Sequence, residues 1–364
     1  KANRADDNGE AFFTYLASHA SKNIKCYFVI SKTSADYHRI RKMGKVIPHL
    51  SWRHKLAVLL SDQIISAYSH VEVTNPFYGY HFPYKDILSE KSFVFLQHGV
   101  TYNDISKSIG KYKRNIKLIV ASSPAEKEAF ISPRYGYTEK NICLAGFPRY
   151  DFLKSSPKRI ISIAPTWRRY LFNGFIPKED RWVLKPEFNN SNFYKSIMYL
   201  VNNERLISAA QKYNYSIYFV PHSVFFPYID QFEVRKEVNM FGTEVRYRDI
   251  FNYSDLLITD YSSIAFDFAY LRKPLIYAQF DKDEFYLNHG YQEGYFSIEK
   301  DGFGEIEYDL ESTIDRIIEY METGCQLKDV YRERIDNFFA FNDQDNCKRV
   351  YEAVKGLSND RNEP

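Results

Sequence analysis

Short runs of β-forming residues alternate with helical segments along almost the whole chain, and this pattern leaves few possible folds. Apolar residues recur at helical spacing in segments such as Pro124–Ile131, Val201–Tyr213, Ile264–Leu271 and Thr313–Met321. Strands that alternate with helices form βαβ units and parallel sheets, with sites at the carboxyl ends of the strands. The sequence therefore predicts an α/β protein with strands at Ile24–Ile30, Gln63–Ala67, Phe93–Leu96, Leu118–Ala121, Ile142–Ala145, Ile160–Ala164, Ser216–Val220, Leu256–Thr259 and Leu275–Ala278.

Length and one polar segment predict two domains. The 364 residues suit two domains of ordinary size, and the polar stretch Asp151–Pro157 ends in proline, as a linker often does. We expect a first domain over residues 1–152, a second over 153–345, and a closing helix and tail over 346–364. The stretch Phe172–Asn192 has no clear period, and we interpret it as a loop insertion.

The start of the chain resembles the middle of an α/β domain. A polar turn and a helix come before any predicted strand, so that the helix lacks a preceding strand to pack on. We therefore expect that a first strand is missing and that the chain is a piece of a longer protein.

Composition excludes several classes of protein. Hydrophobic residues make up 45% of the chain and charged residues 26%, which is typical of a globular protein rather than a disordered one. The net charge of +3 is too small to indicate a nucleic-acid partner. Four scattered cysteines form no CxxC pair, which predicts neither a disulfide framework nor a structural zinc and favours a reducing cytosol. No apolar run reaches the ~18 residues of a transmembrane helix.

Histidines follow two of the predicted strands. The strand FVFL leads into Gln97–Thr101 (QHGVT), and SIYFV leads into Pro221–Ser223 (PHS). Imidazole is the side chain best suited to accept a proton near neutral pH, and Gly99 permits a tight turn after His98. A histidine that is only hydrogen-bonded in a loop is the alternative for each motif. Two such histidines in different halves favour a shared cleft.

Three further motifs contain groups that suit phosphate. The strand IISIA leads into Pro165–Arg169 (PTWRR), where arginines could hold phosphate oxygens or form surface salt bridges. The strand DLLI leads into Thr259–Ser263 (TDYSS) at the start of a helix, where serines could bind phosphate or cap the helix. Asp260 could instead accept a substrate hydroxyl. Arg149 in the run GFPRYD either reaches the cleft floor or is solvated in a turn.

Other candidate motifs are weak. The nucleophile-elbow, Walker A and GxGxxG patterns are absent. Four acidic residues show no metal-ligand spacing, so we interpret them as solvated loop residues and expect no metal site: Asp104, Asp281, Asp283 and Glu284. The run from His289 to Tyr291 is typical of a loop that lines a cleft.

The order of the motifs resembles a known family. QHGVT, GFPRYD, APTWRR, VPHSVF and ITDYSSIAFDFAYLRKPLIYAQFD occur as in the CDP-glycerol glycerophosphotransferases, which comprise teichoic-acid polymerases, primases and related capsule polymerases. The opening RADDNGEAFFTYL is also similar, and the resemblance covers residues 1–357. It implies a GT-B-like fold, with two Rossmann-like domains whose parallel sheets face an interdomain cleft. It also implies transfer of a polyol phosphate from CDP-glycerol or CDP-ribitol, with release of CMP and no cofactor.

The resemblance assigns roles to individual residues. His98 would be the base that takes the proton of the acceptor hydroxyl, and His222 would assist the transferring or leaving phosphate. Gln97 stands where the family usually has tryptophan, which implies an altered acceptor pocket. Val220 stands where the family often has a basic residue, so we expect Arg168 or Arg169 to compensate. The substrate-binding positions implied are Gln97, Gly99, Val100, Thr101, Arg149, Pro165, Thr166, Arg168, Asp260, Ser262 and Ser263.

The resemblance also implies partners and a location. The acceptor would be a teichoic-acid-like or capsular polymer with a lipid anchor, and the enzyme would be peripheral at the cytoplasmic face of the bacterial membrane. Two other classes of function remain open. One is a GT-B glycosyltransferase that uses a nucleotide sugar, and the other is a non-catalytic acceptor-binding module of a larger polymerase.

Overall fold

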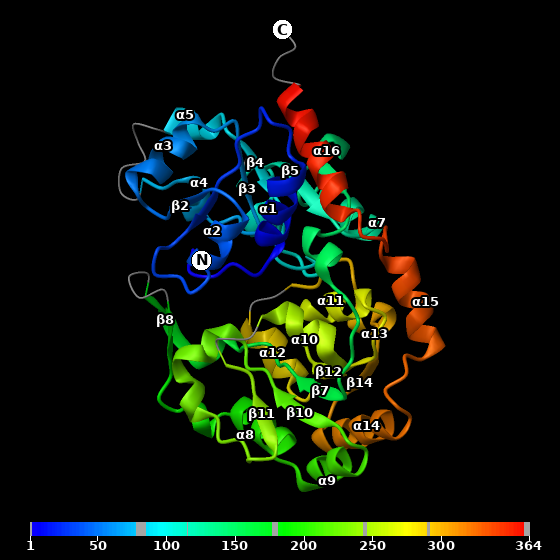
Figure 1. Ribbon diagram of the computed structural model, residues 1–364. Helices are drawn as coiled ribbons and strands as arrows, with labels where there is room; N and C mark the ends of the chain where they lie inside the picture. The colour runs from blue at the N-terminus through cyan, green and yellow to red at the C-terminus, as the bar shows by residue number, and fades with distance from the viewer. Residues whose placement is uncertain are drawn as a thin grey trace. The chain divides into compact units, whose positions relative to one another are not determined.

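The chain divides into two compact units. The computed structural model describes residues 2–77, 85–114, 116–176, 181–242, 246–289 and 292–359 (Figure 1). The first unit comprises Lys1–Phe152 together with Phe338–Pro364, and the second comprises Leu153–Asn337. The chain leaves the first unit after residue 152, where the sequence predicts a boundary. It returns at Phe338, before the predicted end of the second domain at residue 345.

The first unit is built on a four-stranded parallel sheet. Its strand order is β3-β4-β5-β6, with bounds Gln63–Ser66, Ser92–Phe95, Ile116–Ala121 and Ile142–Leu144. A separate parallel pair is formed by β1 (Phe28–Ile30) and β2 (Val46–Pro48), so β1 is shorter than the predicted strand. The helices of this unit are α1 (Asn8–His19), α2 (Tyr37–Met43), α3 (Trp52–Leu60), α4 (Val71–Thr74), α5 (Lys85–Ser89), α6 (Ser106–Ile109), α7 (Pro124–Ile131) and α16 (Asn346–Asn359).

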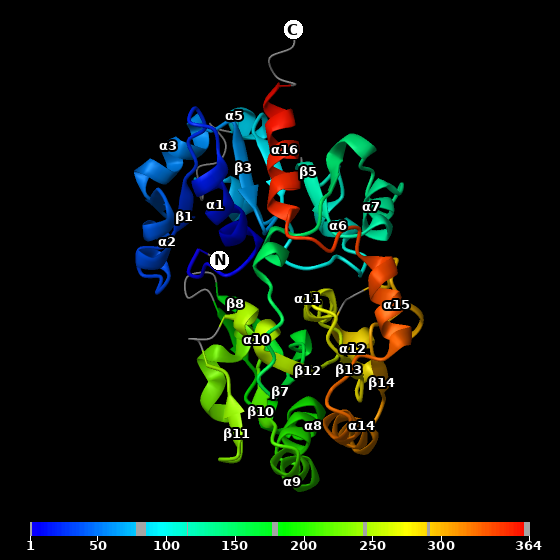
Figure 2. The same ribbon diagram turned by 45° about the vertical axis from the view of Figure 1, so that its right-hand side comes forward.

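Helices from both ends of the chain complete the first unit. Helices α1 and α16 lie side by side, as Figure 2 shows. The Asp151 carboxylate accepts hydrogen bonds from the backbone N–H groups of Asn346 (3.0 Å) and Cys347 (2.7 Å), which caps the N-terminus of α16. The first unit therefore includes residues that follow the second unit in the sequence.

The second unit contains a six-stranded parallel sheet. Its strand order is β11-β10-β7-β12-β13-β14, with bounds Val238–Met240, Ser216–Phe219, Ile160–Ile163, Ser254–Thr259, Leu275–Ala278 and Glu305–Glu307. When only the strands of this sheet are numbered in chain order, this is the doubly wound order 3-2-1-4-5-6 of Rossmann folds. The prediction of an α/β protein with parallel sheets is confirmed. In such sheets a ligand binds where the order reverses, at the carboxyl ends of β7 and β12.

The stretch after β7 is not the loop that the sequence suggests. Strand β8 (Phe172–Ile176) pairs antiparallel with β9 (Arg181–Leu184), so the prediction of a loop insertion was wrong. The aromatic residues of this ribbon stabilise it, because the Trp182 ring packs against Phe172 and Phe175. The α-helices of the unit are α8 (Asn192–Val201), α9 (Glu204–Lys212), α10 (Tyr247–Tyr253), α11 (Ile264–Tyr270), α12 (Lys282–His289), α13 (Ile298–Asp301), α14 (Leu310–Glu322) and α15 (Asp329–Phe338), the last of which ends at the boundary.

Each unit has its own hydrophobic core. In the first unit Phe93, Phe95 and Ile119 belong to one cluster, and in the second Ile161, Phe219 and Leu256 belong to a larger one. Among the residues that the structure describes, no helix is both long enough and apolar enough to span a bilayer. A cleft between the two units stays a prediction.

Candidate functional site

His98 lies just after β4, on a segment that turns away from the sheet. Its side chain is exposed to solvent, and its ring stacks on Tyr68 with centroids 5.3 Å apart and planes inclined by 15°. The Arg149 guanidinium donates a hydrogen bond of 2.8 Å to the backbone carbonyl of His98. The residue thus sits where the sequence predicts it, at a strand end.

The surroundings of His98 favour the neutral imidazole. Desolvation by neighbouring protein lowers the pKa of His98, and the positive charges of Arg149 and His70 act in the same direction. A hydrogen bond with the backbone of Ala67 opposes this shift. These effects lower the pKa of His98 to about 4, so at neutral pH the ring is neutral and one of its nitrogens can accept a proton.

The neighbours of His98 point into the protein. Gln97 is buried, with a left-handed backbone (φ 59°), and its side-chain amide donates to the Val120 carbonyl (2.7 Å) and to Glu126 (3.1 Å). Val100 is also buried, and so is Gly99. The expectation that Gln97 lines an acceptor pocket is therefore not met, because its side chain is used to hold the segment.

The opening motif RADDNGE supports the same segment. Asn8 is buried, and its side-chain amide donates to the carbonyls of Leu96 (3.2 Å) and Gln97 (2.7 Å). Its side-chain oxygen accepts from the backbone N–H of Arg149 (3.0 Å). Asp7 caps α1 and also accepts from the Arg149 guanidinium at 2.7 Å. These contacts connect the start of the chain to the His98 segment.

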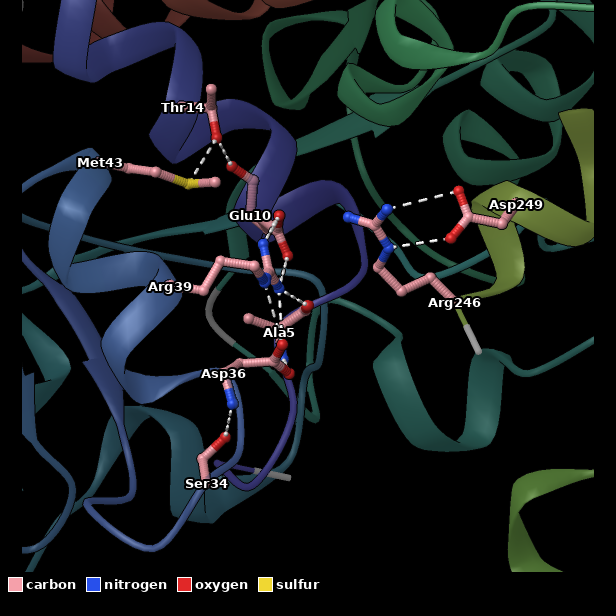
Figure 3. A network of polar contacts seen from close by, with 9 residues as sticks. All are labelled: Ala5, Glu10, Thr14, Ser34, Asp36, Arg39, Met43, Arg246 and Asp249. Carbon is pink, nitrogen blue, oxygen red and sulfur yellow. Dashed lines mark hydrogen bonds and ion pairs between the residues drawn. The ribbon is translucent and has the colours of Figure 1, made fainter. Parts of the chain in front are cut away.

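An ion-pair network holds the start of the chain itself. Figure 3 shows the Arg39 guanidinium between the carboxylates of Glu10 and Asp36, where it also donates to the Ala5 carbonyl (2.7 Å). Asp36 in turn accepts from the backbone N–H of Ala5 at 2.9 Å. Because Ala5 lies two residues before Asp7, this network fixes the turn that presents Asp7 and Asn8.

In the second unit, His222 follows β10 at the carboxyl edge of the sheet. Its Nδ1 accepts a hydrogen bond of 3.3 Å from the backbone N–H of Val224, so a neutral ring carries its proton on Nε2. The ring stacks on Trp167, with centroids 6.1 Å apart. His222 is therefore arranged to donate a hydrogen bond from Nε2.

Thr166 has a buried hydroxyl at the point where the strand order reverses. It follows β7 and is buried beside Pro165, and its backbone N–H donates to Asp260 at 2.9 Å. Among the described residues, the Thr166 hydroxyl is one of the few buried side-chain groups that find no hydrogen-bond partner. Since a buried hydroxyl without a partner is costly, this group is a candidate ligand contact.

Arg168 lies in the interior rather than facing a ligand. It is fully buried, and its guanidinium donates to Asp281 (2.7 and 2.9 Å) and to Asp260 (2.9 Å). The two carboxylates satisfy its charge, which corrects the expectation that Arg168 holds a phosphate. The same pairing corrects the interpretation of Asp281 as a solvated residue and of Asp260 as an acceptor for a substrate hydroxyl, since both are buried.

The two serines lie at the carboxyl end of β12. Both are half-buried, and the Ser262 hydroxyl accepts from the backbone N–H of Ile264 at 3.4 Å. Ser263 precedes α11, and its side chain makes no capping hydrogen bond. The structure thus places Ser262, Ser263 and Thr166 at neighbouring strand ends, because β7 and β12 pair directly.

His289 was a weak candidate from sequence. It ends α12 and is buried, with its ring stacked on Phe285 (4.5 Å between centroids) and at an angle of 78° to Trp167 (5.5 Å). Burial lowers its pKa to about 3, with help from the charges of Arg168, His222 and Arg169. The rest of that motif, residues 290 and 291, lies outside the described residues.

Sequence reasoning missed Asn8, Glu126 and Trp167 as parts of the site. From the sequence, Asn8 is one of several polar residues that could cap the first helix. Glu126 follows Ser123 at the spacing of a capping box, which suggests a helix terminus and not a contact with the His98 segment. In the part of the chain that the structure describes, no group of three or more His, Cys, Asp or Glu side chains could hold a metal ion.

Comparisons with known proteins agree with the fold and the motifs. The family model described as CDP-Glycerol:Poly(glycerophosphate) glycerophosphotransferase matches residues 1–356. The chain is 40% identical over 365 residues to the minor teichoic acid biosynthesis protein GgaB of Bacillus subtilis (strain 168), covering 99% of this chain and 39% of that protein. It is 27% identical over 281 residues to the teichoic acid poly(glycerol phosphate) polymerase of Bacillus spizizenii (strain ATCC 23059 / NRRL B-14472 / W23), covering 68% of this chain and 62% of that protein.

A solved structure shares the fold. The wall teichoic acid polymerase TagF superposes with a TM-score of 0.68 at 17% identity, covering 99% of this chain and 88% of that chain. The chain spans less than two thirds of the length of both curated relatives. Since the family model covers nearly the whole sequence, the chain belongs to the CDP-glycerol:poly(glycerophosphate) glycerophosphotransferase family.

Proposed function

We propose that the protein transfers glycerol phosphate or ribitol phosphate from a CDP-activated donor to the terminal hydroxyl of a teichoic-acid-like or capsular polymer. CMP is the second product. Family membership supports the type of reaction, and one observation on the chain itself carries the proposal. This observation is that the two strand-end histidines use their rings differently. His98 donates a hydrogen bond to the Ala67 backbone, whereas His222 accepts one from the Val224 N–H.

His98 is suited to act as the base. A ring nitrogen that donates to the Ala67 backbone leaves the other nitrogen of the neutral ring as an acceptor. That nitrogen takes the proton of the acceptor hydroxyl as its oxygen attacks the phosphorus next to the polyol. General-base assistance of this kind typically contributes ~10²–10⁴-fold to the rate.

His222 is suited to assist the phosphate. Its Nδ1 is occupied by the Val224 N–H, so Nε2 carries the proton. We assign to Nε2–H a hydrogen bond to a non-bridging oxygen of the transferring phosphoryl group. As the bond between this phosphorus and the bridging oxygen breaks, the electron pair leaves with CMP. Preorganised donors of this kind stabilise charge as it develops in the transition state.

The strand ends of the second unit are assigned to the donor. We assign the binding of its phosphates to the Thr166 hydroxyl, which has no partner among the described residues, and to the hydroxyls of Ser262 and Ser263; the unpartnered Thr166 hydroxyl and the uncapped start of α11 support this assignment. Pro165 precedes Thr166 and has no backbone N–H of its own to satisfy. Arg168 and Asp260 act indirectly, because their ion pair holds the turns after β7 and β12.

The location of the protein follows from its proposed substrates. Nucleotide donors are made in the cytosol, and the acceptor polymer is proposed to be lipid-linked. The reaction then takes place at the cytoplasmic face of the membrane, with the protein bound peripherally. Both the lipid anchor and the membrane contact belong to this proposal.

Product analysis tests the function. The purified protein is incubated with CDP-glycerol or CDP-ribitol, with and without polymer, and CMP is measured. We expect CMP release that depends on the acceptor, and a loss of at least ~10²-fold in the His98→Ala variant with donor affinity retained. His38→Ala, an exposed histidine of the same unit, is the matched control.

Three results would contradict the proposal. Release of a nucleoside diphosphate from a nucleotide sugar would identify a sugar transferase. Binding of polymer with no turnover of either CDP donor would identify a non-catalytic module. Normal turnover by His98→Ala would exclude His98 as the base.

A further inference from the structure

The segment that carries His98 is held on both sides by buried polar side chains. Before His98, the Asn8 amide donates to the consecutive carbonyls of Leu96 (3.2 Å) and Gln97 (2.7 Å). After His98, one carboxylate oxygen of Glu126 accepts the backbone N–H of Thr101 at 2.8 Å. Asn8 and Glu126 thus both act on the backbone that carries the imidazole.

Glu126 is an unusual group to find in this position. It is fully buried on α7, and its carboxylate accepts four hydrogen bonds, all from neutral donors: the backbone N–H groups of Thr101 and Ser122, the Ser122 hydroxyl and the Gln97 amide. Burial raises the pKa of Glu126, while these hydrogen bonds oppose that shift. A buried carboxylate costs free energy that an apolar side chain in the same helix would not. Its benefit must therefore come from the geometry that it imposes.

That geometry includes a strained residue. Gln97 has a φ of 59°, which costs a residue with a side chain about 1–2 kcal/mol relative to ordinary conformations. Its side chain is held at both ends, since its amide donates to Glu126 and Val120 while its carbonyl accepts from the Thr101 hydroxyl. The left-handed turn before His98 is thus maintained by the surrounding hydrogen bonds and not by glycine.

We propose that Asn8 and Glu126 are positioning residues for His98, which fix the turn from Leu96 to Thr101 so that the imidazole faces the reacting hydroxyl. This inference rests on the proposed function, because it takes His98 as the base. Gln97 transmits the effect of Glu126, which gives this residue a role in the turn. Errors of about 1 Å in the placement of a catalytic group can cost ~10²-fold in rate, so we expect Asn8 and Glu126 to affect turnover more than donor binding.

Two isosteric variants test the proposal. Glu126→Gln places an amide N–H against donors that need an acceptor, and Asn8→Asp places an oxygen against two carbonyl oxygens. The matched controls are Glu128→Gln, an exposed residue of the same helix, and Asn23→Asp, an exposed residue of the same unit. For each protein the melting temperature, the affinity for CDP-glycerol, the turnover number and the imidazole NMR signal of His98 are measured, the last assigned with His98→Gln.

We expect the two variants to lose about 10- to 100-fold in turnover while their affinity for CDP-glycerol stays close to that of the parent protein. The His98 signal should shift or broaden in both variants and in neither control. Unchanged turnover with an unchanged His98 signal in folded variants would overturn the proposal. So would a loss of donor affinity equal to the loss of turnover, since that pattern means general disruption.

Two further measurements keep the test decisive. If Glu126→Gln and Asn8→Asp fail to fold, Thr101→Val removes only the hydroxyl that holds Gln97, and it should lower turnover and shift the His98 signal to a smaller extent. No change in either would overturn the proposal. If the parent protein shows no turnover, the proposed function fails, but the His98 signal still reports whether Asn8 and Glu126 fix the ring.

Discussion

The guanidinium of Arg149 donates a hydrogen bond of 2.8 Å to the backbone carbonyl of His98. The same guanidinium pairs with the Asp7 carboxylate at 2.7 Å. The backbone N–H of Arg149 donates to the side-chain oxygen of Asn8. Arg149 was expected to contact the donor, yet these partners connect it to the segment that carries His98, the proposed base. Its environment therefore indicates a role in the placement of His98.

Replacing Arg149 should separate these two roles. In Arg149→Met the His98 carbonyl loses its donor, so we expect turnover to fall by about 10-fold while the dissociation constant of CDP-glycerol changes little. Steady-state kinetics and calorimetric titration measure the two quantities. If the dissociation constant rose by as much as turnover fell, Arg149 would be shown to contact the donor, as first expected.

Thr166→Val should weaken donor binding without a loss of stability. The threonine hydroxyl is buried without a partner among the described residues, so its removal leaves no hydrogen bond broken in the free protein. A lost hydrogen bond to a phosphate corresponds to about 1.5–3 kcal/mol, or roughly 10- to 150-fold in affinity. Thr259→Val is the control, because the Thr259 hydroxyl donates to the Ala164 carbonyl at 2.8 Å. The control should lose stability and keep its affinity.

Arg168→Met should destabilise the second unit. It leaves Asp260 and Asp281 buried without their cation, and breaking such a pair typically costs about 3–5 kcal/mol. Urea denaturation measures the loss. Arg205→Met is the matched control, since the pairs of Arg205 with Glu311 and Asp315 are exposed to solvent and should contribute little to stability. Equal stability of the two variants would contradict the structural role of Arg168.

Stability should fall in acid partly because of His289. Its pKa is lowered from 6.5 to about 3 in the folded protein, so between these values the unfolded chain binds more protons than the folded one. The free energy of unfolding therefore decreases as the pH falls below about 6.5, by up to about 1.4 kcal/mol per pH unit for this group. His289→Gln should show a shallower decrease in urea titrations between pH 7 and 4. An identical decrease in both proteins would mean that His289 is not kept neutral by the fold.

The fold was predictable because the local pattern of apolar residues in the sequence indicates where strands and helices form. Apolar runs such as Leu256–Thr259 and Leu275–Ala278 become buried central strands, and their alternation with helices determines a parallel sheet. The ribbon of β8 and β9 was missed, because its aromatic residues pack on one another instead of following a regular period. Strand ends were also predictable, and they carry His98, His222, Thr166 and the two serines.

The pairing of polar side chains was not predictable from local sequence. The sequence predicts that Arg168 is a phosphate ligand, but in the structure it pairs with Asp281, which is 113 residues away in the chain. From the sequence, Glu126 is expected to be part of a capping box. Its contacts with Thr101 and Gln97 arise only when the unit folds, so the local sequence does not indicate them. Such contacts depend on which loops meet, and one sequence alone does not contain that information.

The first unit is interrupted by the second, and this has a consequence for biosynthesis. Helix α16 packs beside α1, but the ribosome makes it only after all of residues 153–337. The continuous second unit can acquire its native contacts while the first still lacks a helix that covers it. Until translation passes residue 359, where α16 ends, α1 lacks this native partner, so the nascent chain is most exposed to aggregation and chaperone capture during that interval.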